Sequence, residues 1–414
     1  MSISTQPFDA NGKTYQPSAS PIVVICIDGS ADEYLDTTMS FDRMPNLKKM
    51  AQHGYRGMVR GALPSFTNVN NSSIVTGVSP ALHGISGNFF YDAAKDQEVM
   101  MNSAEYLRAE TLLSAAANAG RKVAVVTAKE KLRDILSHKM SGIAISAEKA
   151  NQARTATHGV EDVETIVGHP TPAIYSADAS LFVLRAGVAF IEKGLADFLY
   201  LSLTDYMQHT FSPYAEESLA FYEAMDAEIG KLVALGAIVG ATADHGMNAK
   251  VKPDGKPNVL FVEDMLDEKF GANGFRVICP ITDPYVKHHG ALGSYVVVHV
   301  NDKSKINEIK NWLSIQPGIT EVHDKESAVH VLEQPADRTG DLVVLSARDV
   351  VVGRRPQYHD LSALDGTLRS HGGRYEEMVP MIISHPLNDA YKMKAAGDPR
   401  NFDIFDFTVN GTRL

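Results

Sequence analysis

Short, fully apolar segments recur along this 414-residue chain, and they constrain its fold more than any other feature. The first is "PIVVICIDG" at 21–29, which Pro and Gly bound and in which no polar residue alternates with the apolar ones. Such a run is typical of a strand buried on both faces, as in a parallel sheet. Similar runs are "KVAVVT" at 122–127, "FLYLSLT" at 198–204, "GAIVGAT" at 236–242 and "MVPMIIS" at 378–384.

Helix-like stretches separate these runs. Two of them are "AEYLRAETLLSAAANAG", which ends at Gly120, and "EESLAFYEAMDAEIGKLVALG", which ends at Gly236. Strands that alternate with helices predict an α/β fold with a mostly parallel central sheet flanked by helices. After about residue 253 the rhythm changes to that of a smaller α+β unit. We therefore expect a cap domain at 255–366, inserted into a core domain made of 1–254 and 367–414.

Charge and composition exclude several classes of partner. The chain has 39 Lys and Arg against 50 Asp and Glu, a formal charge of 39 − 50 = −11. An acidic surface does not favour nucleic acid or an anionic membrane as a partner. No apolar run reaches membrane-spanning length and the N-terminus lacks an apolar signal core, so we expect a cytoplasmic protein. The two cysteines predict no disulfide framework, and the oligomeric state is open, a homodimer being one alternative.

Acidic residues follow three of the predicted strands. Asp28 follows "VVICI", Asp205 follows "YLSLT" and Asp244 follows "VGATA". An Asp in such a place is often only a helix N-cap or a turn residue. In an open α/β sheet, however, ligands bind at the carboxyl ends of the strands, so three strands would bring carboxylates to one edge. Three converging carboxylates would raise one another's pKa values, and a bound metal ion removes that conflict.

Histidines accompany these carboxylates at suggestive spacings. Asp205 and His209 are four residues apart, which puts both on one face of a helical turn. Asp244 and His245 are adjacent in "DHGM", and His371 stands in "RSHGG" just before the last predicted strand. Aspartate and histidine together suit zinc, with manganese or iron as alternatives.

A candidate nucleophile lies in "GALPSFTNVNNSSIVTG". Thr67 opens a predicted helix there, so its hydroxyl would lie in the positive potential of a helix N-terminus. A nearby metal ion would lower the pKa of that hydroxyl and produce an alkoxide nucleophile. Taken alone, an N-cap threonine is the simpler interpretation.

The order of these motifs resembles that of the alkaline phosphatase superfamily, over about residues 20 to 390. The resemblance implies two zinc ions and a nucleophile. One zinc would be held by Asp205, His209 and His371, and the other by Asp28, Asp244 and His245, with Thr67 as the nucleophile and a further ligand. It also implies that Asn88, in "HGISGN", binds a phosphoryl oxygen of the substrate. We interpret His83 as structural and the backbone N–H of Asn68 as a second contact.

Other residues indicate which branch of the superfamily the chain resembles. The sulfatase motif is absent, and Thr67 stands where phosphoglycerate mutases of this superfamily carry serine. With "TAKEKL" at 127–132, the chain most resembles the phosphonoacetate hydrolase family. The resemblance implies a phosphonate substrate, cleavage of its carbon–phosphorus bond to acetate and phosphate, and a phosphothreonine intermediate. Lys129 and Lys131 would then bind the substrate carboxylate and stabilise charge that develops on it; the simpler interpretation is a pair of solvated lysines.

Two other functions stay open. One is a zinc-dependent phosphodiesterase, nucleotide pyrophosphatase or phosphonate monoesterase of the same superfamily, and the other is a non-catalytic metal-binding protein. In the cap, the candidates for a further substrate contact are Arg276, Lys287, His288 and His289.

Overall fold

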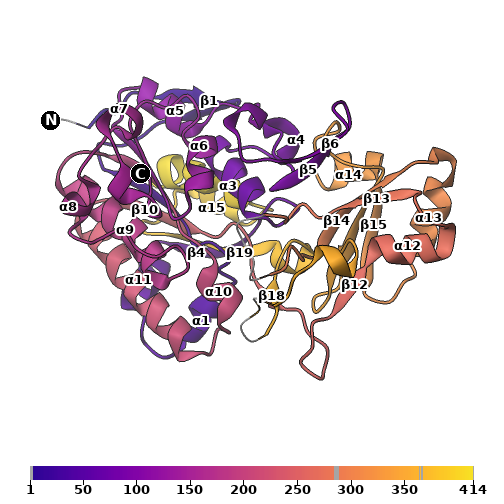
Figure 1. Cartoon of the computed structure of the whole chain (residues 1–414). Helices are drawn as coiled ribbons and strands as arrows, with labels where there is room; N and C mark the ends of the chain where they lie inside the picture. Colours follow the sequence, from indigo (N-terminus) through magenta and orange to yellow (C-terminus); the bar gives the residue numbers. More distant parts are fainter. Residues whose placement is uncertain (1–2, 284–288, 363, 365–366, 414) are drawn as a thin grey trace.

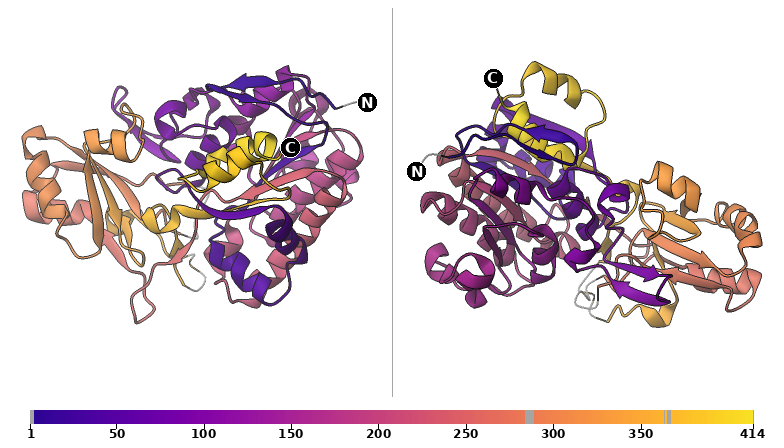
Figure 2. Two further views of the ribbon diagram at one scale, coloured as in Figure 1. Left: turned by 180° about the vertical axis from the view of Figure 1, so that it is seen from behind. Right: turned by 90° about the horizontal axis from the view of Figure 1, so that it is seen from above.

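The computed structural model describes residues 3–283, 289–362, 364 and 367–413, and it forms two lobes of unequal size (Figure 1). Two further views show that the smaller lobe is attached at one end of the larger one (Figure 2). In the described part of the chain, the larger lobe contains a seven-stranded sheet and the smaller lobe a four-stranded sheet. The predicted domain limits stay a prediction.

The seven-stranded sheet is mostly parallel. From one edge to the other its strands are β4 (Tyr55–Arg60), β19 (Met378–Ile383), β10 (Ile238–Thr242), β3 (Ile22–Cys26), β9 (Phe198–Ser202), β7 (Val123–Thr127) and β8 (Ile143–Ser146). The five strands from β10 to β8 are parallel, whereas β19 runs antiparallel to both of its neighbours. The predicted fold class is confirmed.

Helices cover both faces of this sheet, which explains why its strands are apolar throughout. In β3, Val23 and Ile25 face one core, and Val24 and Cys26 face the other. The first core is closed by α1 (Asp32–Ser40), α2 (Pro45–His53), α9 (Ala177–Glu192) and α11 (Glu216–Ala234). The second is closed by α3 (Thr67–Thr76), α5 (Leu112–Asn118), α6 (Glu130–Leu136) and α16 (Ile404–Asp406).

The smaller lobe is an antiparallel sheet with helices. Its strands are, in order, β13 (Phe275–Ile278), β14 (Tyr295–Val300), β16 (Leu342–Ser346) and β15 (Ile319–Asp324), and its helices include α12 (Val262–Phe270), α13 (Ile306–Leu313) and α14 (Lys325–Val331). Apolar contacts join the two lobes: the ring of Phe66, which precedes α3, meets that of Tyr295 edge to face at 6.3 Å. From the larger lobe, the hairpin of β5 (Phe89–Asp92) and β6 (Gln97–Met100) also reaches the smaller one, where Arg276 lies 4.1 Å over the ring of Tyr91.

Some local predictions differ from the structure. The single helix expected to end at Gly120 is a short 3-10 turn, Ala104–Tyr106, followed by α5, which begins at Leu112. The helix begins there because the Thr111 hydroxyl accepts a hydrogen bond from the Ser114 N–H and caps it. Strands β4 and β8 were not predicted. Among the described residues, no helix has the length and apolar character needed to cross a membrane.

Candidate active site

The three aspartates predicted at strand ends lie at one edge of the central sheet. Asp28 follows β3, Asp244 follows β10, and Asp205 joins β9 to the short helix α10 (Tyr206–Thr210). Because these three strands are adjacent and parallel, their carboxyl ends deliver all three side chains to the same place. All three are at most 3% exposed, so the carboxylates are buried together.

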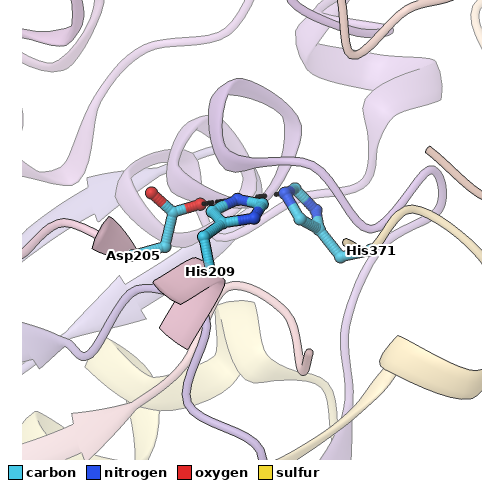
Figure 3. Close-up of side chains that lie close together, drawn as sticks. All are labelled: Asp205, His209 and His371. Carbon is cyan, nitrogen blue, oxygen red and sulfur yellow. Dashed lines mark ion pairs between the residues drawn. The ribbon is translucent and has the colours of Figure 1, made fainter. Parts of the chain in front are cut away.

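The structure brings the six predicted ligand side chains into two groups. Asp205, His209 and His371 form the first, which Figure 3 shows, and Asp28, Asp244 and His245 form the second. Within each group, the atoms able to bind a metal ion lie within 4.8 Å of one another. The groups adjoin, because the imidazole rings of His245 and His371 stack with their centroids 3.5 Å apart.

Backbone carbonyls orient all three imidazoles. The Nδ1 atoms of His209, His245 and His371 lie 2.8, 2.8 and 2.7 Å from the carbonyl oxygens of Arg369, Gly246 and Ser65. A carbonyl only accepts hydrogen bonds, so each Nδ1 carries a proton, and in the neutral ring each Nε2 presents a lone pair. Such a bond fixes the tautomer and orientation of a metal-binding histidine.

These Nε2 lone pairs face carboxylate oxygens. His209 Nε2 lies 2.9 Å from Asp205 Oδ2, and His245 Nε2 lies 3.3 Å from Asp28 Oδ1. Both oxygens of Asp28 are buried, and no described residue donates a hydrogen bond to either of them. Opposed electron-rich atoms in a buried site are stabilised by a cation between them, and nitrogen with oxygen donors suits zinc. The residues present therefore fit a pair of divalent metal ions.

The pKa shifts of Asp28 and Asp205 show how strongly charge is confined in these two groups. Burial, and then the neighbouring Asp205 and Asp244, raise the pKa of Asp28 well above its usual range. Burial also opposes ionisation of Asp205, but Lys129 and His209 outweigh it and hold the pKa of that carboxyl well below its usual range. The neighbouring cations thus outweigh burial at Asp205 but not at Asp28.

Thr67 lies at the second group of ligands, at the start of α3. Its Oγ1 is 3.4 Å from His245 Nε2, and the residue is 8% exposed. One helical turn further on, Asn71 donates hydrogen bonds to the Thr67 carbonyl and to Asp244 Oδ2, at 3.1 and 3.3 Å. The Asn71 amide thereby joins the first turn of α3, which carries Thr67, to Asp244 of the second group.

Asn88 lies between the lobes. Its backbone N–H donates to the Pro280 carbonyl at 2.8 Å and its side-chain amide to the Ile281 carbonyl at 3.3 Å. Asn68, next to Thr67, donates from its side chain to the Met101 carbonyl at 2.9 Å. His83 is fully buried and bonds Ser73 at 2.8 Å, which suits the structural interpretation.

Lys129 and Lys131 line a cavity of about 440 Å³ beside the first group. Lys129 precedes the first residue of α6, and its Nζ lies 3.0 Å from Asp205 Oδ1, on the side of that carboxylate away from the histidines. Lys131 pairs with Asp283 of the smaller lobe. The alternative of two solvated lysines is wrong, because their side chains are only 12% and 16% exposed.

The smaller-lobe candidates differ in their positions. Arg276 ion-pairs with Asp96 of the β5–β6 connection at 3.3 Å, so it faces that hairpin. The ring of His289 is buried and lies 5.3 Å, centroid to centroid, from that of His209. Lys287 and His288 lie outside the described residues.

The sequence did not predict a buried ion pair that holds together the loops that follow His245 and His371. Lys250 Nζ and Glu376 Oε1 are 2.8 Å apart, and both side chains are inaccessible to solvent. Glu376 Oε2 accepts the Gly373 N–H at 3.1 Å, and its backbone carbonyl accepts the Gly246 N–H at 2.8 Å. Glu376 thus binds the loop after His371 as well as the loop after His245. Only tertiary packing brings these residues together, so no local pattern could have revealed them.

Comparison with known proteins places this geometry in a family. Residues 22–374 match the family model of type I phosphodiesterase / nucleotide pyrophosphatase. The chain belongs to this family. The membership confirms the predicted relation to the alkaline phosphatase superfamily and makes the chain a member of a family of hydrolases.

Two kinds of solved structure resemble this chain over nearly its full length. Phosphonoacetate hydrolase from Sinorhizobium meliloti 1021, crystallised with phosphonoacetate and with phosphonoformate, is 41% identical over 99% of this chain and 100% of that one, with a TM-score of 0.94. Murine ectonucleotide pyrophosphatase/phosphodiesterase 5 is 16% identical over 95% of this chain and 96% of that one, with a TM-score of 0.64, and shows the same fold.

Curated relatives match over shorter segments. Venom phosphodiesterase of Macrovipera lebetinus is 26% identical over 52% of this chain and 23% of its own length. Ectonucleotide pyrophosphatase/phosphodiesterase family member 3 of Bos taurus is 34% identical over 20% of this chain and 10% of its own length. The matched region is thus less than a quarter of these relatives.

Proposed function

We propose that this protein is a di-zinc phosphonoacetate hydrolase, which cleaves the carbon–phosphorus bond of phosphonoacetate to give acetate and phosphate. The observation that carries the proposal is the position of Lys129. Its ammonium bonds Asp205 Oδ1 and lines the same cavity as Lys131, so two lysine ammonium groups lie beside the first ligand group. A substrate with a phosphonate and a carboxylate one carbon apart fits such a pair of neighbouring sites. The 41% identity to a phosphonoacetate hydrolase supports the same assignment.

The metal ions would be held by the two groups of three ligands. When bound, they would neutralise the phosphonate oxygens and lower the pKa of the Thr67 hydroxyl. Thr67 Oγ1 would then attack phosphorus, and the bond from phosphorus to the methylene carbon would break. The electron pair of that bond would pass to the methylene carbon and into the adjacent carboxylate as an enediolate. Protonation of the carbon by solvent gives acetate, and water hydrolyses the phosphothreonine.

The lysines supply what this leaving group needs. Carbon is a poor leaving atom, and its departure is feasible only if the charge that reaches the carboxylate oxygens is stabilised. Lys129 and Lys131 are held in place before the reaction, so their charges need no reorganisation as the enediolate forms. Asn88 would bind a phosphoryl oxygen with its amide.

A phosphate-release assay tests the proposal. Phosphonoacetate, 2-aminoethylphosphonate and phosphonopyruvate are compared, with and without a chelator. We expect phosphate from phosphonoacetate, loss of activity with the chelator and recovery with zinc. The two other phosphonates have a different group at the position of the carboxylate and serve as controls.

The family match favours a second candidate, a phosphodiesterase or phosphonate monoesterase that uses the same ligand groups. Efficient hydrolysis of p-nitrophenyl esters together with untouched phosphonoacetate would establish it in place of the first. Metal-loaded protein that turns over neither kind of substrate would indicate a non-catalytic metal-binding protein, against which the buried Thr67 hydroxyl beside the ligands argues.

A further inference from the structure

Asp283 of the smaller lobe lies in the cavity where the substrate carboxylate would bind. It ion-pairs with Lys131, although 152 residues separate the two in sequence. Its side chain is 1% exposed, and it lines the same cavity as both lysines. The segment before it is fixed to the larger lobe, because the Pro280 and Ile281 carbonyls accept the two hydrogen bonds from Asn88.

Both ammonium groups therefore face a protein carboxylate. Lys129 bonds Asp205, and that carboxylate also faces the histidines of the first ligand group. Asp283 belongs to neither ligand group, and it ion-pairs with Lys131. A carboxylate that enters the cavity meets a Lys131 whose charge is already compensated.

We propose that Asp283 is a specificity-determining residue that occupies the carboxylate position on Lys131 and yields it to the carboxylate of the substrate. The inference rests on the proposed function and deepens it. A phosphonate without a carboxylate has nothing to exchange with Asp283 and leaves the Asp283–Lys131 pair in place. Small anions from solution must compete with a carboxylate that the fold already holds there.

The physical reason lies in the charge balance of the cavity. Without Asp283, Lys131 would lose its ion-pair partner beside the Lys129 ammonium, and small anions would bind to Lys131 more tightly. With Asp283, binding exchanges one carboxylate for another on Lys131, so Lys131 keeps its charge-assisted hydrogen bond while Asp283 loses its own. The exchange therefore lowers the affinity of the cavity for every carboxylate by a similar factor, for free acetate as well as for phosphonoacetate.

The test compares wild type with Asp283→Asn, which keeps the shape of the side chain and removes its charge. Burial, and then the Lys129 ammonium, lower the pKa of Lys131 to about 7, so both enzymes are assayed at pH 6, where the lysine is charged. The measured quantities are KM for phosphonoacetate and the inhibition constants of acetate and of ethylphosphonate, which lacks the carboxylate. Asp254→Asn, at an exposed aspartate 3.4 Å from Lys256, is the matched control.

We expect Asp283→Asn to lower both KM for phosphonoacetate and the inhibition constant of acetate about tenfold, which corresponds to about 1.4 kcal/mol. The constant for ethylphosphonate should stay unchanged, and in a Lys131→Met background the same substitution should have no effect on any of them. A KM that rises or does not change would overturn the inference. If the asparagine variant does not fold, Asp283→Ser is measured with the same criteria. Wild type that does not hydrolyse phosphonoacetate would instead refute the proposed function.

Discussion

Replacing Lys129 by methionine removes its charge and keeps most of its apolar stem. In the proposed reaction the ammonium lies about 4 Å from a carboxylate that gains charge as the carbon–phosphorus bond breaks. Two unit charges at that distance interact by about 4 kcal/mol at an effective dielectric constant of about 20. If about half of the electron pair's charge has reached the carboxylate in the transition state, Lys129 contributes about 2 kcal/mol there, which corresponds to a factor of about 30 in kcat.

The assay measures kcat on phosphonoacetate and on an aryl phosphonate monoester, whose phenolate leaving group places no charge near the lysine. We expect kcat of Lys129→Met to fall about 30-fold on phosphonoacetate and by less than about 3-fold on the ester. Lys122→Met is the matched control. Lys122 is an exposed lysine just before the amino end of β7, whereas Lys129 follows the carboxyl end of the same strand.

The metal content of each variant must be equal, because Lys129 also bonds the predicted ligand Asp205. Equal losses on the two substrates at equal metal content would refute the enediolate role. The lysine would then act only through the metal site.

Three further predictions concern the framework of the site. Thr67→Ala should lower kcat by at least about 10⁴-fold, as loss of a nucleophile does, whereas Thr67→Ser should keep measurable activity and form a phosphoserine that mass spectrometry of acid-quenched enzyme detects. Glu376→Gln should lower the free energy of unfolding by about 3–5 kcal/mol in a denaturant titration, because it leaves Lys250 charged and buried without its partner; an unchanged stability would contradict this. Gly29→Ala should lower zinc affinity at the first group, because Gly29 has φ +72° and an added Cβ would lie 2.9 Å from Asp205 Cβ; a zinc titration with wild-type affinity would contradict this.

Much of the site could be predicted because its residues follow apolar runs directly. Asp28 and Asp244 each come within two residues of the end of a strand, and a parallel sheet collects such positions at one edge. The position of Thr67 could be predicted for a similar reason, since it opens a helix. Position along the chain was enough for these residues.

The missed residues act through contacts that sequence does not encode locally. Asp283 reaches Lys131 from the other lobe, and Glu376 reaches two loops more than a hundred residues apart. The antiparallel direction of β19 and the edge strand β4, whose sequence "YRGMVR" carries two arginines, also follow from tertiary packing. The helix expected up to Gly120 begins later because one side chain, Thr111, caps it.

The most direct measurement follows the fate of the carbon–phosphorus bond by proton NMR in D₂O, with zinc-loaded enzyme and phosphonoacetate. If the bond breaks to an enediolate that solvent protonates, the products are phosphate and an equal amount of acetate that carries one deuterium on its methyl carbon. Phosphate and labelled acetate should both disappear when a chelator is added, and both should return with zinc. Unchanged phosphonoacetate in the presence of rapid p-nitrophenyl ester hydrolysis, or acetate without deuterium, would contradict the account.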